Sequence, residues 1–304
     1  SCGWGLEAIA LAVGKIKAGM ADCIIAGGTE SMSMLPMMGY KTVLNWKIAS
    51  QTPEYYLSMG LTAEELAKDY EITREQADEF SANSHTKALA AIAAGKFKEQ
   101  IVPIEVEETY LDEKGKRKTR KTIVDTDEGP RAGTTPEVLA NLKPAFKMNG
   151  QVTAGNSSQT SDGAAFVVVM SERMVKELNL EPIARMMSYS VAGVDPRIMG
   201  IGPKEAVPKA LKQAGLSFDK IDLIELNEAF AAQGLAVIKS LDMDISKVNV
   251  NGGAVALGHP LGCTGAKLSI QLFHELRRQN KKYGLVTACV GGGQGVAGVF
   301  ELLK

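Results

Sequence analysis

The sequence predicts an α/β fold made of two copies of one unit, with the first copy incomplete and a long subdomain inserted into it. Three observations support this prediction. A helical pattern followed by an apolar strand and glycines occurs near both ends of the chain, strands and helices alternate through its last third, and the stretch between the copies far exceeds an ordinary connection. A duplicated core is therefore expected.

The first copy of the unit lies at the start of the chain. Leu6, Ile9 and Val13 recur at helical spacing, and Gly19 ends the helix. Residues 22–26 then form a mostly apolar run that stops at two glycines, which is typical of a buried strand. This is a helix that leads directly into a strand.

The second copy lies near the end of the chain and repeats this order. Residues 264–279 carry a helical apolar pattern, and residues 285–290 form an apolar strand followed by three glycines. Further elements precede this copy, with strands expected at 183–188, 221–226 and 248–250 and helices at 204–214 and 228–240. Such alternation predicts a mainly parallel sheet with helices on its faces.

The two copies differ in the length of chain that precedes them. Residues 184–262 come before the helix of the second copy, whereas nothing comes before Ser1. Counting in βαβ units of about 30 residues, we expect that a comparable part of the first unit is absent from the N-terminus.

The chain divides into three parts on this basis. Residues 1–29 and 161–182 are assigned to the remainder of the first unit, residues 30–160 to the inserted subdomain, and residues 183–304 to the second unit. The inserted part is too long to be a loop, so it should contain secondary structure of its own.

The inserted part carries two predicted capping boxes and a basic segment. Thr62 with Glu65 and Thr73 with Gln76 have the required spacing, and the second pair opens a long helix. Residues 111–121 are strongly basic around a glycine. They predict a solvated hairpin tip, with a phosphate-binding or nuclear-import segment as the alternative.

The bulk composition limits the classes of partner. The 304 residues include 34 basic and 35 acidic side chains, which give a formal net charge of −1. No global positive field would attract nucleic acid or anionic lipid, and no apolar run approaches the roughly 18–20 residues that span a bilayer. We expect neither nucleic acid nor a membrane as a partner.

The four cysteines indicate a reducing compartment. Cys2, Cys23, Cys263 and Cys289 are too scattered for a disulfide framework and form no CxxC pair, so neither zinc nor another metal is expected. A bacterial-type cytoplasmic location is the default. An organelle is not excluded, because a targeting segment could precede Ser1.

Two residues are candidates for chemistry because of their local surroundings. Cys2 precedes Gly3 at the start of an apolar helix, where free backbone N–H groups favour a thiolate, although such a cysteine is more often a small buried residue. His259 lies in a glycine-dense loop, where backbone can approach a ligand closely. His85 and His274 lie within helical patterns and are assigned structural roles.

Two further candidates follow predicted strands. Cys289 ends a strand just before three glycines, and Asn227 follows another strand at the same edge of the predicted sheet. Because ligands bind at this edge of open parallel sheets, these side chains are expected to share one site with Cys2 and His259. The other two cysteines are assigned structural roles.

Four sequence blocks together resemble the active-site blocks of the thiolase family. They are Cys2-Gly-x-Gly5, Asn227-Glu-Ala-Phe-Ala231, Gly258-His-Pro260 and Cys289-Val-Gly291, and residues 28–33, 127–131 and 152–157 resemble further thiolase segments. The resemblance covers essentially the whole chain. It implies a five-layered α-β-α-β-α fold of two βαβαβαββ halves, of which the first is incomplete here.

The resemblance also implies a division of labour among the reactive residues. Cys2 would be the nucleophile that takes the acyl group, His259 would withdraw its proton, and Cys289 would exchange a proton with the second substrate. One oxyanion hole would consist of the backbone N–H groups of Cys2 and Gly291. A second would combine His259 with a water molecule held by Asn227.

Coenzyme A and acetyl-CoA are the substrates that the resemblance implies, with no permanently bound cofactor. The implied contacts lie near the adenosine end (Arg131, Phe146), along the pantetheine (Ala154, Ser158) and around the thioester tunnel (Met59, Ala229, Phe230). The inserted subdomain would supply oligomer contacts, so a homodimer or homotetramer is expected.

The activity implied is thiolysis of a 3-ketoacyl-CoA, reversible as a Claisen condensation, with fatty-acid β-oxidation as its setting. An acetoacetyl-CoA-specific acetyltransferase is the alternative within the family. Trp4 departs from the family pattern, which has Ser or Thr there, and its ring is expected to crowd the helix start or the thioester. A second alternative is therefore a catalytically impaired chain that only binds acyl-CoA or forms oligomers.

Overall fold

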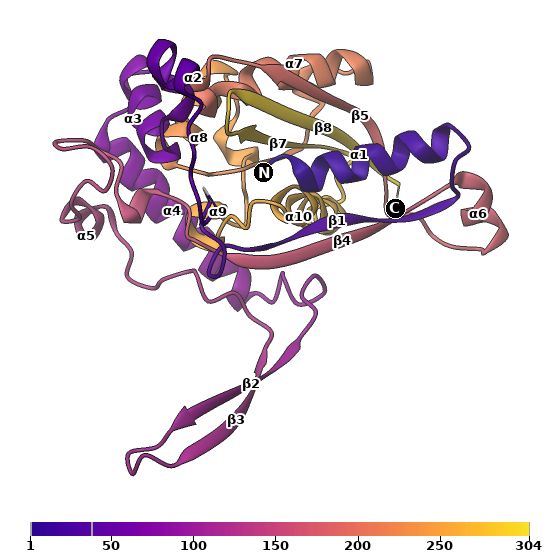
Figure 1. Cartoon of the computed structure of the whole chain (residues 1–304). Coiled ribbons are helices and arrows are strands. Elements are labelled where there is room, and N and C mark those ends of the chain that lie inside the picture. Colours follow the sequence, from indigo (N-terminus) through magenta and orange to yellow (C-terminus); the bar gives the residue numbers. More distant parts are fainter. Residues whose placement is uncertain (1, 38, 304) are drawn as a thin grey trace.

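The centre of the molecule is a pair of helices between two β-sheets. The structure is a computed structural model that describes residues 2–37 and 39–303. Helices α1 (Trp4–Lys17) and α10 (Thr264–Arg278) pack against each other between the sheets (Figure 1). Both helices coincide closely with the two repeated helices that the sequence predicts.

The two sheets differ in size. The smaller sheet pairs β1 (Cys23–Ser31) with β4 (Asp162–Met170) in antiparallel register. The larger sheet has four strands, in the order β5 (Ala184–Gly193), β8 (Gln294–Leu302), β7 (Tyr283–Val290) and β6 (Leu223–Leu226). The second copy of the unit is thus the more complete one among the described residues.

The described residues form four layers. Helix α7 (Gly202–Ala214) covers the outer face of the larger sheet, and α8 (Ala231–Ser240) packs into the same apolar core (Figure 1). A second apolar core surrounds α1 and α10 between the sheets. On the outer face of the smaller sheet, where a fifth layer would lie, Ile25, Phe166 and Val168 are exposed.

The expectation of a mainly parallel sheet is right about strand direction, since β5, β6 and β7 run the same way, but wrong about pairing. Among the described ladders only β6 pairs with β7 in parallel, whereas β8 runs antiparallel to both β5 and β7. The glycines at 291–293 reverse the chain after β7, two of them with a φ of +93°, so β8 must return alongside β7. The strand expected at 248–250 is also wrong, because Val248 makes only an isolated bridge.

Helices α1 and α10 cross at two glycines. A Cβ atom on Gly5 would lie 2.6 Å from the backbone nitrogen of Ala266, and one on Gly265 would lie 2.2 Å from that of Leu6. Only glycine lets two backbones approach this closely. Because each glycine is the second residue of its helix, the crossing holds the N-terminal ends of both helices beside each other.

The segment between β1 and β4 contains several elements of its own. They are α2 (Trp46–Gln51), α3 (Met59–Asp69), α4 (Arg74–Ala93), β2 (Ile104–Leu111), β3 (Arg117–Val124) and α5 (Pro136–Ala140). Two short helices complete the fold, α6 (Glu172–Glu177) and α9 (Ala254–Leu257). The capping box of Thr73 and Gln76 is confirmed, but Thr62 lies inside α3, whose N-cap is Ser58. The division of the chain at residues 30 and 160 stays a prediction.

Strands β2 and β3 form a hairpin that projects away from the rest of the chain (Figure 1). All of their residues are exposed, and Gly115 in the turn has a φ of +73°. Arg120 pairs with Glu108 and Lys121 with Glu105 across the strands. The predicted solvated hairpin tip is confirmed. Within the described part of the chain, no helix is long and apolar enough to cross a membrane.

Candidate active site

Cys2 lies two residues before α1 begins. Its side chain is buried, and burial raises the pKa of the thiol above its ordinary value. A hydrogen bond from the backbone of Gly291 acts in the opposite direction, because it favours the thiolate. Burial is the larger effect, so the helix start does not by itself yield a thiolate, contrary to expectation. Cys2 needs a base.

Cys289 lies in β7, one residue before the strand ends, and is fully buried. Burial raises the pKa of its thiol, and the electrostatic effect of Cys2 raises it further. The two sulfur atoms are therefore close enough to influence each other. Both thiols are protonated at neutral pH, and each can release its proton only to a base beside it.

His259 is the candidate base, and its hydrogen bonds fix the orientation of its ring. Its Nδ1 lies 2.6 Å from Oγ1 of Thr264, whose hydroxyl donates to the carbonyl of Pro260 at 2.9 Å. Since the single hydroxyl proton of Thr264 is used there, Nδ1 of His259 must carry the proton in this contact. Its Nε2 then has the lone pair, which accepts from Nδ2 of Asn227 at 3.2 Å.

The protonation state of His259 agrees with this assignment. The side chain is buried, and burial lowers the pKa of the imidazole to about 3. A ring with this pKa is neutral at physiological pH, so Nε2 carries a lone pair. The side-chain oxygen of Asn227 is buried and has no hydrogen-bond partner among the described residues, so it offers an acceptor to a substrate group or water molecule.

An apolar wall of packed side chains adjoins Cys289. Met59, Ala229, Phe230 and Cys289 belong to one buried cluster, and the Met59 sulfur would lie 3.1 Å from a Cβ atom on Gly291. The three residues expected around a thioester tunnel are thus brought together beside Cys289.

Two of the expected coenzyme A contacts adjoin this apolar wall. The ring of Phe146 meets that of Phe230 edge to face, with centroids 6.1 Å apart. The backbone N–H of Ser158 donates to the carbonyl of Ala229 at 2.9 Å. Both residues come from the inserted segment, which therefore reaches the site.

The other two expected contacts, Ala154 and Arg131, are exposed and are not part of this cluster among the described residues. Ala154 is exposed in a single turn of helix, and Arg131 is an exposed residue whose backbone N–H donates to Nδ1 of His85 at 3.1 Å. That bond explains the buried position of His85 and fits its structural assignment.

The expected crowding of the buried helix start by Trp4 is wrong. Its side chain is 67% exposed, so it does not fill the buried helix start. It lines a pocket together with Gly3 and Gly291, so the alternative, crowding of the thioester, stays a prediction. Two residues that matter to the geometry were missed, Thr264 and Glu228. Thr264 follows His259 by five residues at the start of α10, and the N-terminal position of a hydroxyl residue was the available signal.

Two thiols that influence each other, and a neutral imidazole that bonds the carboxamide of Asn227, lie at helix starts and strand ends of a duplicated α/β fold. Such groups are typical of enzymes that transfer acyl groups through a cysteine. Comparison with known families is more specific. Residues 1–173 match the model described as thiolase, N-terminal domain, and residues 180–302 match thiolase, C-terminal domain. The chain belongs to the thiolase family.

Individual relatives are similar over nearly the whole chain. A 3-ketoacyl-CoA thiolase of Bacillus subtilis is 54% identical over 99% of this chain and 77% of its own length, and an acetyl-CoA acetyltransferase of Pseudomonas aeruginosa is 50% identical over 97% and 76%. Human mitochondrial 3-ketoacyl-CoA thiolase in complex with CoA has a TM-score of 0.87 at 43% identity, covering 99% of this chain and 76% of that one. The dimeric peroxisomal thiolase of Saccharomyces cerevisiae has a TM-score of 0.88 at 39% identity, covering 99% and 74%.

Proposed function

We propose that this thiolase cleaves a 3-ketoacyl-CoA with coenzyme A to give acetyl-CoA and a shortened acyl-CoA, and that it also runs the reverse condensation. The observation that supports the proposal is that Cys2 and Cys289 influence each other, while Asn227, which bonds His259, is tied through its backbone N–H to Thr287 of the strand that carries Cys289. The B. subtilis relative and the CoA-bound human structure support the substrate class.

The first half-reaction uses all three groups. The Cys2 sulfur attacks the keto carbonyl while Nε2 of His259 takes the thiol proton. The carbon–carbon bond breaks, and its electron pair leaves on the acetyl-CoA carbon, which takes a proton from Cys289. The product is an acyl thioester on Cys2.

The second half-reaction restores the enzyme. The thiol of coenzyme A attacks the thioester and gives its proton to the Cys289 thiolate. The Cys2 sulfur leaves and recovers its proton from His259. Backbone N–H groups of Cys2 and Gly291 would stabilise the oxyanion, and the loss of one such donor typically costs about 3–4 kcal/mol of barrier.

The substrate would lie along the apolar wall already described. Met59, Ala229 and Phe230 would line the thioester, with Ser158 and Ala154 along the pantetheine and Phe146 and Arg131 toward the adenosine. The shared cluster of Met59, Ala229, Phe230 and Cys289 supports the first of these assignments.

We propose that the enzyme is a homo-oligomer in the cytoplasm that serves fatty-acid β-oxidation. The dimeric yeast relative supports a dimer, and the projecting β2–β3 hairpin would be available for further contacts in a tetramer. All four cysteines are free thiols, which favours a reducing compartment. The exposed position of Trp4 argues against crowding of the buried helix start, which is one reason for expecting an impaired chain.

An acyl-enzyme measurement tests the proposal. The purified chain is incubated with acetyl-CoA, and intact-protein mass spectrometry should show one acetyl group that is absent in Cys2→Ser. A folded wild-type chain without the adduct would overturn the proposal. Comparing thiolysis of acetoacetyl-CoA with that of longer 3-ketoacyl-CoA substrates then separates the broad enzyme from an acetoacetyl-CoA-specific one, which the P. aeruginosa relative makes the second candidate.

A further inference from the structure

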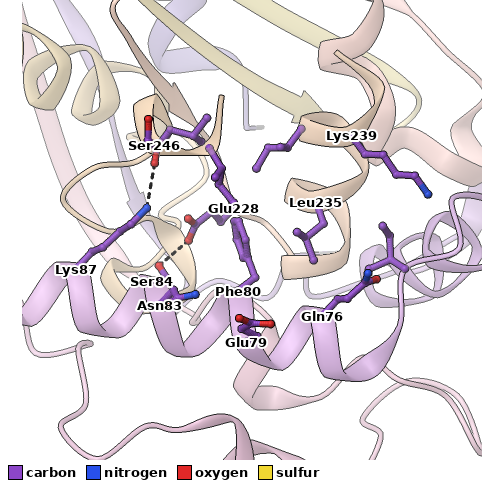
Figure 2. Close-up of a pocket in the computed structure, with 14 residues that line it drawn as sticks. Gln76, Glu79, Phe80, Asn83, Ser84, Lys87, Glu228, Leu235, Lys239 and Ser246 are labelled. Carbon is purple, nitrogen blue, oxygen red and sulfur yellow. Dashed lines mark hydrogen bonds between the residues drawn. The ribbon is translucent and has the colours of Figure 1, made fainter. Parts of the chain in front are cut away.

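Glu228 follows Asn227 in the loop between β6 and α8 and has no place in the reaction described above. Its side chain is 2% exposed. The carboxylate accepts hydrogen bonds from Oγ of Ser84 at 2.8 Å, from Nδ2 of Asn249 at 2.8 Å and from the backbone N–H of Val255 at 3.2 Å. Figure 2 shows Ser84 of α4 directed at Glu228. One buried side chain thus connects three separate segments.

Each of these segments adjoins the candidate active site. Val255 lies in α9, which ends just before Gly258 and His259. Asn249 has a left-handed φ of +44° and bonds both backbone groups of Leu226, the last residue of β6. Ser84 belongs to α4 of the inserted segment. The Glu228 carboxylate therefore joins the loop that carries Asn227 to the segment that leads into His259.

The hydrogen-bond pattern at Glu228 requires a group that only accepts. Ser84 accepts at Oγ from the backbone N–H of Gly253 at 3.0 Å, so its own proton is directed to Glu228. Donors therefore face both carboxylate oxygens. Burial raises the pKa of Glu228, and the three hydrogen bonds oppose this effect by favouring the ionised form. The space is also tight, because a Cβ atom on Gly253 would lie 2.1 Å from the carboxyl carbon.

We infer that Glu228 is a positioning residue for the thiolase reaction, because its ionised carboxylate clamps α9 and α4 to the end of β6 and so fixes Asn227 against His259. The inference rests on the proposed function. Glu228 acts through the 3.2 Å contact between Asn227 and His259 and does not touch the reacting atoms. Loss of the clamp should lower turnover more than substrate binding.

A cavity makes the inference testable by chemical rescue. A volume of about 600 Å³ lies between α4 and α8, and its lining includes Ser84, Glu228, Phe80 and Leu235 (Figure 2). A small anion that enters this cavity could occupy the place of a deleted carboxylate. Lys239, also in the lining, is exposed and bonds only the carbonyl of Tyr70 among the described residues, which makes it a matched control.

The experiment compares Glu228→Gln, Glu228→Ala and Lys239→Ala with the wild type. Mass spectrometry first gives the fraction of molecules whose Cys2 becomes acetylated. Thiolysis rates are then divided by that fraction to give kcat, and KM is measured in the same assay. In Glu228→Gln an amide nitrogen must face a donor whichever way the amide is turned. Because hydrogen bonds to charged groups are strong, kcat should fall about 10- to 100-fold while KM changes less than about threefold.

Chemical rescue of Glu228→Ala distinguishes a carboxylate that positions Asn227 from one that only stabilises the fold. Formate should restore kcat of Glu228→Ala at least about tenfold, whereas formamide should not, and Lys239→Ala should stay within about twofold of the wild type. A folded Glu228→Gln enzyme with wild-type kcat per site overturns the inference, as does a folded Glu228→Ala enzyme that responds to neither or to both additives. A wild type that forms no acetyl adduct overturns the proposed function instead.

Discussion

The two central helices, α1 and α10, each begin beside a buried cysteine, and the two cysteines have different surroundings. Cys2 precedes α1 and Cys263 is the N-cap of α10. The helices are brought together by Gly5 and Gly265, and aligning these glycines places Cys263 opposite Gly3, one residue after Cys2. Burial raises the pKa of both thiols, to about 11 for Cys263. A helix start is therefore common to both cysteines and cannot be what makes one of them reactive.

The difference lies in the neighbours from other elements. Cys2 has the backbone hydrogen bond from Gly291 and a second thiol, Cys289, close by. The start of α10 supplies Thr264, which holds the imidazole of His259. The start of α1 thus follows the proposed nucleophile, and the start of α10 holds the proposed base. The two helix starts are similar, and their neighbours at the strand ends give them different surroundings.

The largest effect is expected when each cysteine is replaced in turn. Cys2→Ala removes the nucleophile and should lower thiolysis kcat by at least about 10³-fold. Cys263→Ala should leave kcat within about threefold, because its sulfur only packs in the interior, 3.7 Å from a Cβ atom on Gly163. Steady-state thiolysis at matched folded fractions is the measurement. A comparable loss in a folded Cys263→Ala enzyme would contradict the distinction.

A smaller effect on turnover is expected at Thr264. Thr264→Val keeps the shape but removes the oxygen that accepts from Nδ1 of His259, so the imidazole loses its fixed tautomer. We expect kcat to fall about tenfold, and Thr264→Ser, which restores the hydroxyl, to recover most of it. If the valine and serine variants are equally active, the assigned tautomer is wrong.

The helix crossing should affect stability more than turnover. Gly265→Ala forces a Cβ atom against the backbone of α1 and should lower the free energy of unfolding by about 1–3 kcal/mol. Gly14→Ala is the matched control, because nothing lies within 4 Å of its Cβ position and alanine favours a helix by about 0.5–1 kcal/mol. Urea unfolding measures both. Equal effects in the two variants would show that the crossing does not depend on the glycine.

Much of the fold and the reactive groups could be predicted because they depend on local pattern. The helices at the two repeats follow apolar spacing, and Cys2, His259 and Cys289 stand at element ends marked by glycines. The direction of β8 could not be predicted, because strand order depends on which strands meet in space. The glycines after β7 can be identified as a hairpin turn only when the position of β8 beside β7 is known.

The missed residues are those whose partners are distant in the sequence. Glu228 meets Ser84 across 144 positions, and nothing in the local pattern of either residue indicates the contact. Trp4 was misjudged for a related reason, since its exposure depends on which side of α1 faces the sheets. Local sequence therefore predicted the reactive groups better than the groups that hold them.

The smallest effect on turnover is expected at Glu225 of β6, which faces the core around α10. Its carboxyl is buried, one of its oxygens has no hydrogen-bond partner, and burial raises its pKa to about 8. An unfolded glutamate has a pKa of about 4.3, so between these values the folded chain holds a proton that the unfolded chain releases. The contribution of Glu225 to the free energy of unfolding of the wild type should therefore fall as pH rises from about 4.3 to 8.

Glu225→Gln should remove that dependence. The amide cannot ionise, so the free energy of unfolding of the variant relative to the wild type should increase from pH 5 to pH 8, by at most about 1.4 kcal/mol per pH unit. Thiolysis kcat should stay within about twofold. Glu275 of α10 offers the contrast, because Asn251 and Lys96 contact its carboxylate and its pKa is lowered. Its stabilising contribution is present above the unfolded pKa and is lost as pH falls, so Glu275→Gln should change the pH dependence of urea unfolding in the opposite direction.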